Sequence, residues 1–298
     1  MTINWGLVQL GIFLSAFFAL VVAERRWPRR TLSIELVTRW SANMGFTVVN
    51  AAASAGMRFL APAALVGAAF YIQSHGYGLL PAMGAPAWIA AVVTFAALDL
   101  TLFGLHVACH RFSLLWRFHR VHHVDLDVDA TTAFRSHPAE CLASQLCKLA
   151  AILALGAPAM AVLAYEIVLN AFAMFSHANI RLGEKTDRAL RWFIVTPDMH
   201  RIHHSTYQPE TDSNYGVVTP LWDRLFATYM TAPRAPQPTM KLGLDDVRGS
   251  EASNLFWLLA YPFISLKAVS SDASSEQAPL KPSAAKRVPV TTSLRTPA

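Results

Sequence analysis

The sequence has 298 residues, of which 54% are hydrophobic and only 15% are charged. Charged residues make up about a quarter of a typical soluble domain, so these proportions exclude an ordinary soluble protein and indicate a membrane protein. The formal net charge is +6, but the basic residues flank apolar segments and match no nucleic-acid-binding motif, so we expect no nucleic-acid partner. The three cysteines cannot all pair with one another, and they predict no disulfide scaffold.

The first apolar segment runs from Trp5 to Ala23, and its 19 residues include no charged side chain. This length is sufficient for one crossing of a bilayer. No basic region precedes the segment and no small-residue cleavage site follows it, so we interpret it as a retained helix rather than a signal peptide. The arginine-rich segment ERRWPRR comes next, which predicts that this end of the helix faces the cytoplasm.

Two further apolar segments precede the first histidines. Residues 41–72 are interrupted by Arg58, and we interpret them as one tilted span. The loop 73–87 has no Lys, Arg, Asp or Glu, as expected of a loop on the outside. The segment from Trp88 to His106 is then a span that returns to the cytoplasmic side.

The apolar segment from Cys141 to Ser176 is 36 residues long and carries a turn signal, Gly-Ala-Pro at 156–158, in its middle. We expect a helical hairpin that enters the membrane and returns. The basic segments 106–140 and 177–250 then both face the cytoplasm. A single site can be built from both segments only if they lie on the same side of the membrane.

These segments predict an all-α fold, a multi-pass transmembrane helical bundle with a cytosolic helical cap that carries the histidines. The segment from Asn254 to Ala268 contains Pro262 and is too short for a span, which predicts an interfacial or docking helix. The expected divisions are 1–86 for N-terminal transmembrane helices, 87–232 for the histidine-rich domain, 233–269 for a C-terminal segment with the interfacial helix, and 270–298 for a disordered tail.

The histidines are the most informative residues, because ten of the eleven lie between His106 and His204. They form one H-x3-H pair, two copies of H-x2-H-H and two single residues: His106 and His110; His119, His122 and His123; His200, His203 and His204; His137 and His177. Residues three and four apart on a helix project from the same face, so each group presents its imidazoles to one point. The pattern therefore predicts a metal-binding site formed by these histidines.

Ten imidazoles are more than one metal ion accepts, since a tetrahedral zinc site takes four ligands. The set suits two ions with five or six ligands each and room for oxygen or water. Imidazole binds zinc, copper, iron and nickel alike, so the ligand type does not identify the metal. Solvated loop histidines are a weaker explanation of the repeated pattern, and haem ligands would lie within the spans rather than at their ends.

Ordered motifs extend over residues 90–230. They comprise Asp99 with the H-x3-H pair, the segments HRVHH, RSHPAE, SHANI and HRIHH, and finally DSNYG and LWDRLFATY. This series resembles the fatty acid hydroxylase/sterol desaturase superfamily. Phe103 and Ala227 stand where a tyrosine and a glycine are expected, which bears on the subfamily more than on the chemistry.

The resemblance implies a membrane-bound, O2-dependent enzyme whose ten histidines hold a non-haem di-iron centre, with no catalytic residue needed beyond the ligands. It implies a lipid substrate and electrons from a separate donor protein, cytochrome b5-like or ferredoxin-like, and ultimately from NAD(P)H. We expect hydroxylation of a fatty acyl or sterol-like lipid, with sterol or lipid desaturation and ether-lipid monooxygenation as alternatives. A histidine-rich metal-binding or transport protein is an alternative of another class, but its ligands would line a path through the bilayer midplane.

Polar residues near the histidines are candidates to orient them, because a ligating imidazole is normally held by a carboxylate or another acceptor. Asp99 lies two helical turns before His106, and Glu140 begins the predicted hairpin. The candidates are Asp99, Glu140, Asn179, Asp198, Asn214 and Asp223.

Two other acidic features receive a simpler interpretation. We interpret Asp125, Asp127 and Asp129 as parts of a solvated loop. Glu166 lies in the second arm of the predicted hairpin, where it is expected to contact substrate or a partner helix, with Arg58 as one candidate partner.

Overall fold

The computed structural model describes residues 5–56 and 62–264, and within these ranges the chain is helical, with isolated β-bridges and no strand. The longer helices are α1 (Trp5–Arg26), α2 (Leu36–Gly56), α3 (Pro62–His75), α5 (Ala87–Arg111), α7 (Pro138–Leu155) and α8 (Ala159–His177). The shorter ones are α4 (Leu79–Ala82), α6 (Ser113–His123), α9 (Glu184–Leu190), α10 (Pro197–His203), α11 (Gln208–Thr211), α12 (Leu221–Leu225) and α13 (Leu255–Ala260), with 3-10 helices η1 (Ala130–Phe134), η2 (Ser250–Ser253) and η3 (Tyr261–Phe263). The predicted all-α fold is confirmed.

Four helices in the described ranges are long and apolar enough to cross a membrane: α1, α5, α7 and α8. None of the residues of α1 is buried, and Leu14 and Phe18 are 52% and 70% exposed. A continuous apolar surface of this kind is expected to lie against lipid rather than water. The predicted helices that begin near Trp5 and Trp88 are therefore confirmed.

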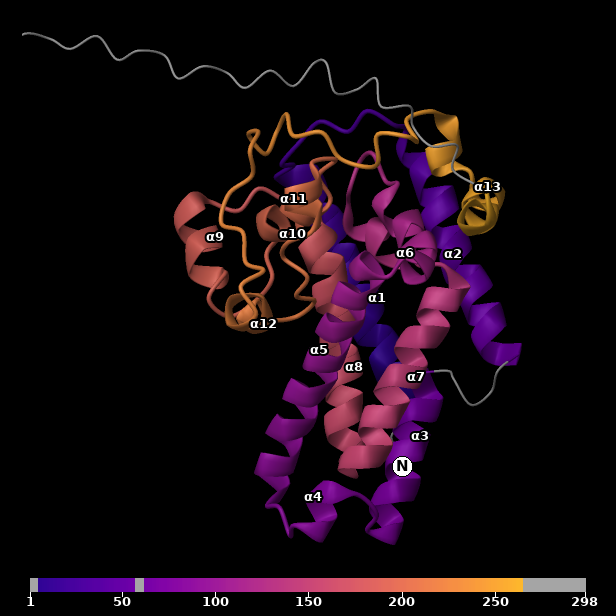
Figure 1. The fold of residues 1–298 in the computed structure, drawn as a ribbon, viewed down its shortest axis with the longest axis vertical. Coiled ribbons are helices and arrows are strands. Elements are labelled where there is room, and N and C mark those ends of the chain that lie inside the picture. Colours follow the sequence, from indigo (N-terminus) through magenta and orange to yellow (C-terminus); the bar gives the residue numbers. More distant parts are fainter. Residues whose placement is uncertain (1–4, 57–61, 265–298) are drawn as a thin grey trace, which may run out of the picture. The chain divides into compact units, whose positions relative to one another are not determined.

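The predicted hairpin is also confirmed, since α7 and α8 run antiparallel and turn at residues 156–158 (Figure 1). Gly156 ends α7 with a left-handed φ of 69°, a conformation that favours glycine. A Cβ on Gly156 would also lie 2.2 Å from the Tyr77 carbonyl oxygen. The 18 residues of α7 rise about 27 Å, slightly less than the roughly 30 Å of a hydrocarbon core. The hairpin therefore returns the chain to the side from which it came.

Residues 41–72 do not form the single span predicted for them. The described parts of this range, 41–56 and 62–72, belong to two helices, α2 and α3, and neither is among the membrane-span candidates of the described ranges. α2 buries two polar side chains, Arg39 and Asn43, so it packs against protein where a span would face lipid. The new helix α3 begins at Pro62, a residue suited to a helix start because it lacks an N–H; Arg58 lies outside the described residues.

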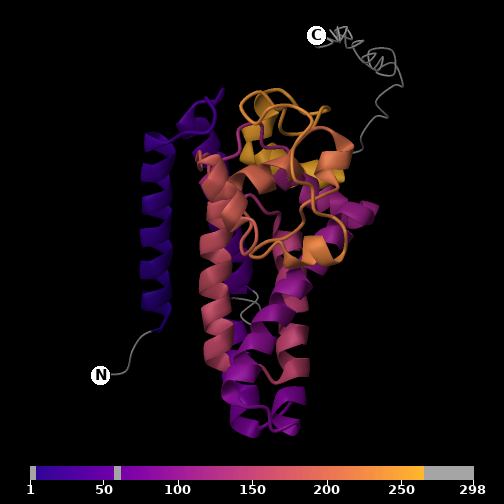
Figure 2. The same cartoon turned by 90° about the vertical axis from the view of Figure 1, so that its left-hand side faces the viewer.

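An apolar core joins α3, α5, α7 and α8, which lie side by side in both views (Figures 1 and 2). Leu65, Leu98, Ile152 and Tyr165, one from each helix, are completely buried in it. α1 packs on α8 through partly buried residues such as Phe13 and Phe17. Packing in this bundle places the C-terminal ends of α5 and α8 next to one another. His106 and His110 lie at the end of α5, and His177 lies at the end of α8.

The bundle also contains a buried ion pair between the two arms of the hairpin. The Lys148 Nζ atom of α7 lies 2.7 Å and 3.0 Å from the two carboxylate oxygens of Glu166 on α8, and both residues are buried. Glu166 therefore contacts a partner helix, as one of its two predicted roles requires.

Except for α4, which lies at the opposite end of the bundle, the remaining elements form a cap at one end of it (Figure 1). Its core contains Val121 of α6, Phe46 of α2 and Leu258 of α13, all completely buried. The Arg120 guanidinium lies 3.8 Å from the centre of the Tyr261 ring and donates a 2.8 Å hydrogen bond to the Tyr261 carbonyl oxygen. Within the segment from Asn254 to Ala268, for which an interfacial or docking helix was predicted, the described part forms α13 and η3 and packs against α2 and α6. The predicted disordered tail lies outside the described residues.

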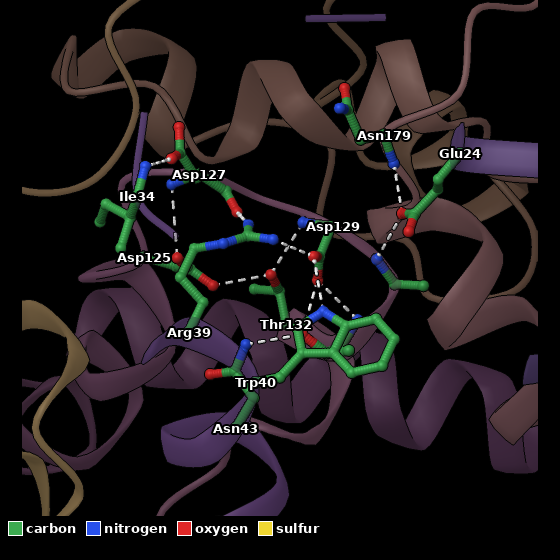
Figure 3. A network of polar contacts seen from close by, with 12 residues as sticks. Glu24, Ile34, Arg39, Trp40, Asn43, Asp125, Asp127, Asp129, Thr132 and Asn179 are labelled. Carbon is green, nitrogen blue, oxygen red and sulfur yellow. Dashed lines mark hydrogen bonds and ion pairs between the residues drawn. The ribbon is translucent and has the colours of Figure 1, made fainter. Parts of the chain in front are cut away.

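The loop that carries Asp125, Asp127 and Asp129 is not solvated, as the sequence suggested, but buried in a polar network (Figure 3). The Asp127 carboxylate accepts hydrogen bonds from the backbone N–H groups of Ser33 and Ile34. Asp129 pairs with the completely buried Arg39 and caps η1. Because buried carboxylates require such partners, the network fixes the loop between α6 and α7 against the segment that follows α1.

Candidate metal centre

Nine of the ten predicted histidines meet in two adjacent groups, and within each group the candidate ligand atoms lie within 4.8 Å of one another. Site A consists of His106, His110, His119, His123 and His203. Site B consists of His122, His177, His200 and His204. Segments up to 98 positions apart in the sequence, from His106 to His204, therefore build one centre at the junction of bundle and cap.

Each H-x2-H-H motif contributes to both sites. On α6, His119 and His123 belong to site A while His122 belongs to site B. On α10 the assignment is reversed: His203 belongs to site A, and His200 and His204 belong to site B. The middle and last histidines of each motif are consecutive residues and point about 100° apart around the helix, whereas the first and last differ by only about 40°. The first and last can therefore serve one site while the middle one serves the other.

Most of the imidazoles are oriented by an acceptor at Nδ1. His106 donates to the Tyr215 carbonyl oxygen at 2.7 Å, His203 to the Ser213 carbonyl oxygen at 2.8 Å, and His177 to the Ala173 carbonyl oxygen at 2.7 Å. His119 Nδ1 lies 2.8 Å from Glu140, and His110 Nδ1 lies 3.3 Å from Asp212. Such partners set the tautomer that leaves the Nε2 lone pair free for a metal ion.

Several Nε2 atoms of the site histidines lie close together or buried without a hydrogen-bond donor or acceptor to pair with. The Nε2 atoms of His106, His110 and His203 are buried and have no hydrogen-bond partner. His177 Nε2 lies 3.0 Å from His122 Nε2 and 3.1 Å from His200 Nε2. Lone pairs that converge in this way in a buried space repel one another unless a cation lies among them, so the donor set fits metal ions.

The electrostatics of the site agree with metal ligation. Burial lowers the pKa of His122, His123, His200, His203 and His204 well below the usual value for histidine, and neighbouring imidazoles lower it further. A buried imidazole is therefore neutral near pH 7, which is the form that binds a metal.

The structure does not bring His137, the tenth predicted ligand, to either site. Its Nδ1 accepts a hydrogen bond from the Ala139 N–H at 3.2 Å, which caps the start of α7, and its Nε2 lies 3.3 Å from the Leu259 carbonyl oxygen. Its ring packs beside Phe118 and Phe263. The ligand set supported by the geometry therefore has nine histidines, because the helix start occupies the tenth.

Of the six residues predicted to orient ligands, Glu140 contacts a site histidine directly. Asp99 instead accepts a 2.9 Å hydrogen bond from Trp222 Nε1, and Asp198 pairs with Arg29 and Arg201. These two carboxylates have other partners in the structure because Arg29 and Trp222, both distant in sequence, fold against them, and because Arg201 lies three residues after Asp198 on the same helix.

The other three candidates act on the backbone around the site. Asp223 accepts hydrogen bonds at 2.8 Å from the N–H groups of Tyr215 and Gly216, and so holds the carbonyl that orients His106. The Asn214 amide donates to the Met199 carbonyl oxygen of α10. The Asn179 side chain joins the backbone of Arg30 through both its oxygen and its nitrogen.

Sequence reasoning missed the backbone acceptors and two side chains. Asp212 lies in the DSNYG motif, but the motif did not indicate that this carboxylate would contact His110. Trp116 contacts three site A rings, with ring centroids 5.0 Å, 5.3 Å and 6.2 Å from those of His110, His123 and His119. A carbonyl that accepts from a histidine leaves no signal in the residue types, so these partners were not predictable.

A cavity of about 250 Å³ opens beside the two sites. Five of the candidate ligands line it, namely His106, His119, His122, His177 and His200. The rest of its wall is mixed, with Leu102, Leu105, Leu169 and Val217 as well as Ser136, Glu140, Ser144 and Asn170. A molecule in this cavity would therefore lie against ligands of both sites.

The described part of the chain thus combines four helices that are long and apolar enough to cross a membrane with two adjacent clusters of imidazoles that could each hold a metal ion. Residues 91–228 match the fatty acid hydroxylase family. The chain belongs to the fatty acid hydroxylase/sterol desaturase superfamily, as the sequence motifs indicated.

Three relatives illustrate the range of the superfamily. The ornithine lipid hydroxylase OlsE of Rhizobium tropici is 30% identical over 179 residues, which cover 59% of this chain and 52% of that protein. The alkylglycerol monooxygenase of Xenopus tropicalis is 28% identical over 138 residues, covering 46% and 30%. The very-long-chain aldehyde decarbonylase CER1 of Arabidopsis thaliana is 27% identical over 177 residues, covering 54% and 27%. The chain thus matches about half or less of the length of these relatives, and no solved structure matches it significantly.

Proposed function

We propose that the protein is a membrane-bound, O2-dependent oxidoreductase that uses two iron ions to hydroxylate a C–H bond of a fatty acyl or sterol-like lipid. The observation that carries the proposal is the pair of adjacent imidazole clusters that share one cavity. Superfamily membership supports iron over the other metals that imidazole binds.

The ligand count supports a reactive centre over a structural one. Structural zinc sites are closed by four ligands, whereas site A offers five imidazoles and site B four. Two six-coordinate ions held by these nine groups would keep open positions, which oxygen and substrate require. When bound, the irons would supply the activation of O2 and the oxidation of the C–H bond.

The chain's own residues supply position and shielding. His106, His119, His122, His177 and His200 border the cavity, so a lipid carbon placed there lies beside both sites. Glu140 and the carbonyl oxygens of Tyr215, Ser213 and Ala173 hold the rings in place. Burial excludes water from the imidazoles, which protects a reactive centre from side reactions.

A second cavity supports entry of the substrate from the lipid phase. It has a volume of about 270 Å³ and lies between α1 and α8, where Gly6, Phe13 and Ile167 line it. Asn170 lines both this cavity and the one beside the metal sites. A lipid in the outer cavity would thus lie one side chain away from the inner one.

We further propose that the site faces the cytoplasm and takes electrons from a separate donor protein, cytochrome b5-like or ferredoxin-like, and ultimately from NAD(P)H. Arg25 and Arg26 end α1 at the cap, and Arg29 and Arg30 pair within the cap. Positive charge at this end of the spans supports a cytoplasmic orientation.

The proposal is tested by metal analysis and by lipid mass spectrometry of cells with and without the protein. One lipid class should gain the mass of one oxygen atom; loss of two hydrogens would indicate a desaturase, and loss of an alkyl ether a monooxygenase of ether lipids. His203→Ala should abolish the change and lower the iron content, whereas the matched variant His137→Ala should keep both ions. Unchanged lipids with normal iron content would contradict the proposal.

A further inference from the structure

Trp116 of α6 connects the metal centre to the protein surface. Its ring contacts His110, His119 and His123 of site A, and the side chain is partly exposed. Among the described residues the other non-histidine ring in contact with site histidines is that of Tyr215, which is completely buried. Trp116 is therefore the aromatic group that reaches both solvent and the ligands.

The Trp116 face is separate from the lipid cavity. His110 and His123 contact Trp116 but do not line the cavity, while His106, His122, His177 and His200 line the cavity and do not contact Trp116. His119 borders both. One side of the centre is thus available to substrate and the other to a second reactant.

The surface around Trp116 is basic with an apolar component. Arg111 and Arg117 flank it in sequence, both are exposed, and neither makes an ion pair with a described residue. Phe112 and Leu114 are 63% and 65% exposed. Unpaired arginines around exposed apolar groups fit a protein partner with an acidic face, because complementary charge steers association.

We infer that Trp116 is the point at which electrons enter the metal centre, and that Arg111 and Arg117 form the docking surface for a reduced, acidic electron-transfer protein. The inference rests on the proposed function. Hydroxylation of a C–H bond by O2 consumes two electrons and two protons: one oxygen atom enters the alcohol and the other leaves as water. The donor supplies these electrons one at a time and is oxidised, and the Trp116 ring provides the path without being chemically changed.

The first test measures reduction of the iron-loaded protein by a reduced [2Fe–2S] ferredoxin as the probe, followed in a stopped-flow spectrometer without O2. Trp116→Leu should slow reduction severalfold, and Trp116→Phe should retain part of the rate because it keeps a ring. Trp192→Leu is the matched control, since Trp192 is exposed on the cap and stacks on Arg224 away from the histidines. Reduction by dithionite, which needs no docking, corrects for any change in the centre itself.

The second test measures docking on the metal-free protein in nanodiscs. The double variant Arg111→Glu, Arg117→Glu should lower the association rate with ferredoxin by about tenfold or more at low salt, and the effect should shrink as salt is added. Arg181→Glu with Arg188→Glu, on exposed arginines elsewhere in the cap, should leave the rate unchanged. Ferredoxin should also protect Arg111 and Arg117 from arginine-specific labelling.

The outcomes separate this inference from the proposed function. A protein that binds no redox-active metal overturns the proposed function, and with it the electron path. A protein that binds iron and is reduced equally well with Trp116→Leu overturns the inference alone, as does unchanged docking of the arginine variant. Arginines that resist labelling in nanodiscs without ferredoxin would show that lipid covers this face, which also overturns the inference.

Discussion

The contact between Glu140 and His119 offers the sharpest test of how the centre is built. Glu140 Oε1 lies 2.8 Å from His119 Nδ1, and the two side chains are 16% and 5% exposed. Glu140→Ala removes the hydrogen-bond acceptor, and Glu140→Gln keeps an acceptor oxygen on a side chain of similar length but removes the negative charge. Both leave all nine candidate ligands in place, so any change in metal binding reports on orientation of a ligand.

The expected magnitude follows from the geometry. Loss of a group that orients a metal ligand lowers metal affinity by about 10- to 100-fold, which corresponds to about 1.4–2.7 kcal/mol. Glu140→Ala should approach the larger value, because the contact is short and mostly buried. Charge-assisted hydrogen bonds are about twice as strong as neutral ones, so Glu140→Gln should lose about half of this free energy.

The assay is a competitive titration of the purified protein with Co²⁺ against a chelator, which resolves two binding events. Only one event should weaken, because His119 belongs to site A. Glu184→Ala, on the exposed first turn of α9, is the control and should bind both ions normally. If Glu140→Ala bound both ions with unaltered affinity, the contact would have no role in ligation; if both events weakened equally, separate sites would be the wrong description.

Three further predictions concern stability. Lys148→Met should lower the free energy of unfolding by about 3–5 kcal/mol, because it leaves the Glu166 carboxylate buried without its partner; adding Glu166→Leu should restore most of the loss, as thermal unfolding in detergent will show. Ala227→Gly should stabilise the protein by roughly 1 kcal/mol in the same assay, because Ala227 holds a left-handed φ of 57°; a lower melting temperature would contradict this. The metal-free protein should lose stability as the pH falls below about 6.5, because burial lowers the pKa of five site histidines and the unfolded chain takes up protons first. Denaturant titrations across this range measure the slope, and a flat profile would show that the sites are not neutral.

The sequence predicted those features that depend on local spacing. The hairpin followed from Gly156 and Pro158 between two apolar runs. The histidine spacing predicted that each group presents its imidazoles to one point, whereas the structure divides each H-x2-H-H motif between two sites. The sequence also showed that Ala227 stands where a glycine is expected. The structure explains this expectation, because residue 227 has a positive φ, which favours glycine.

Features that depend on distant partners were not predictable. Asp129 was interpreted as solvated because a lone carboxylate usually is, yet Arg39 lies 90 positions away in the sequence and pairs with it. The sequence pattern predicted His137 as a ligand, but the Ala139 N–H at the start of α7 donates a hydrogen bond to its ring. In both cases the competing partner, not the residue itself, decides the outcome.

The reciprocal use of the two H-x2-H-H motifs explains why the motif occurs twice. On α6 the outer histidines serve site A and the middle one serves site B, while on α10 the outer pair serves site B and the middle one site A. The rings of His123 and His203 lie 4.6 Å apart, and those of His122 and His204 lie 4.7 Å apart. Neither site can be completed by one helix alone, so an ion in one site holds both helices in the position that the other site needs. In the proposed two-ion centre, each of the two three-histidine motifs therefore contributes ligands to both ions.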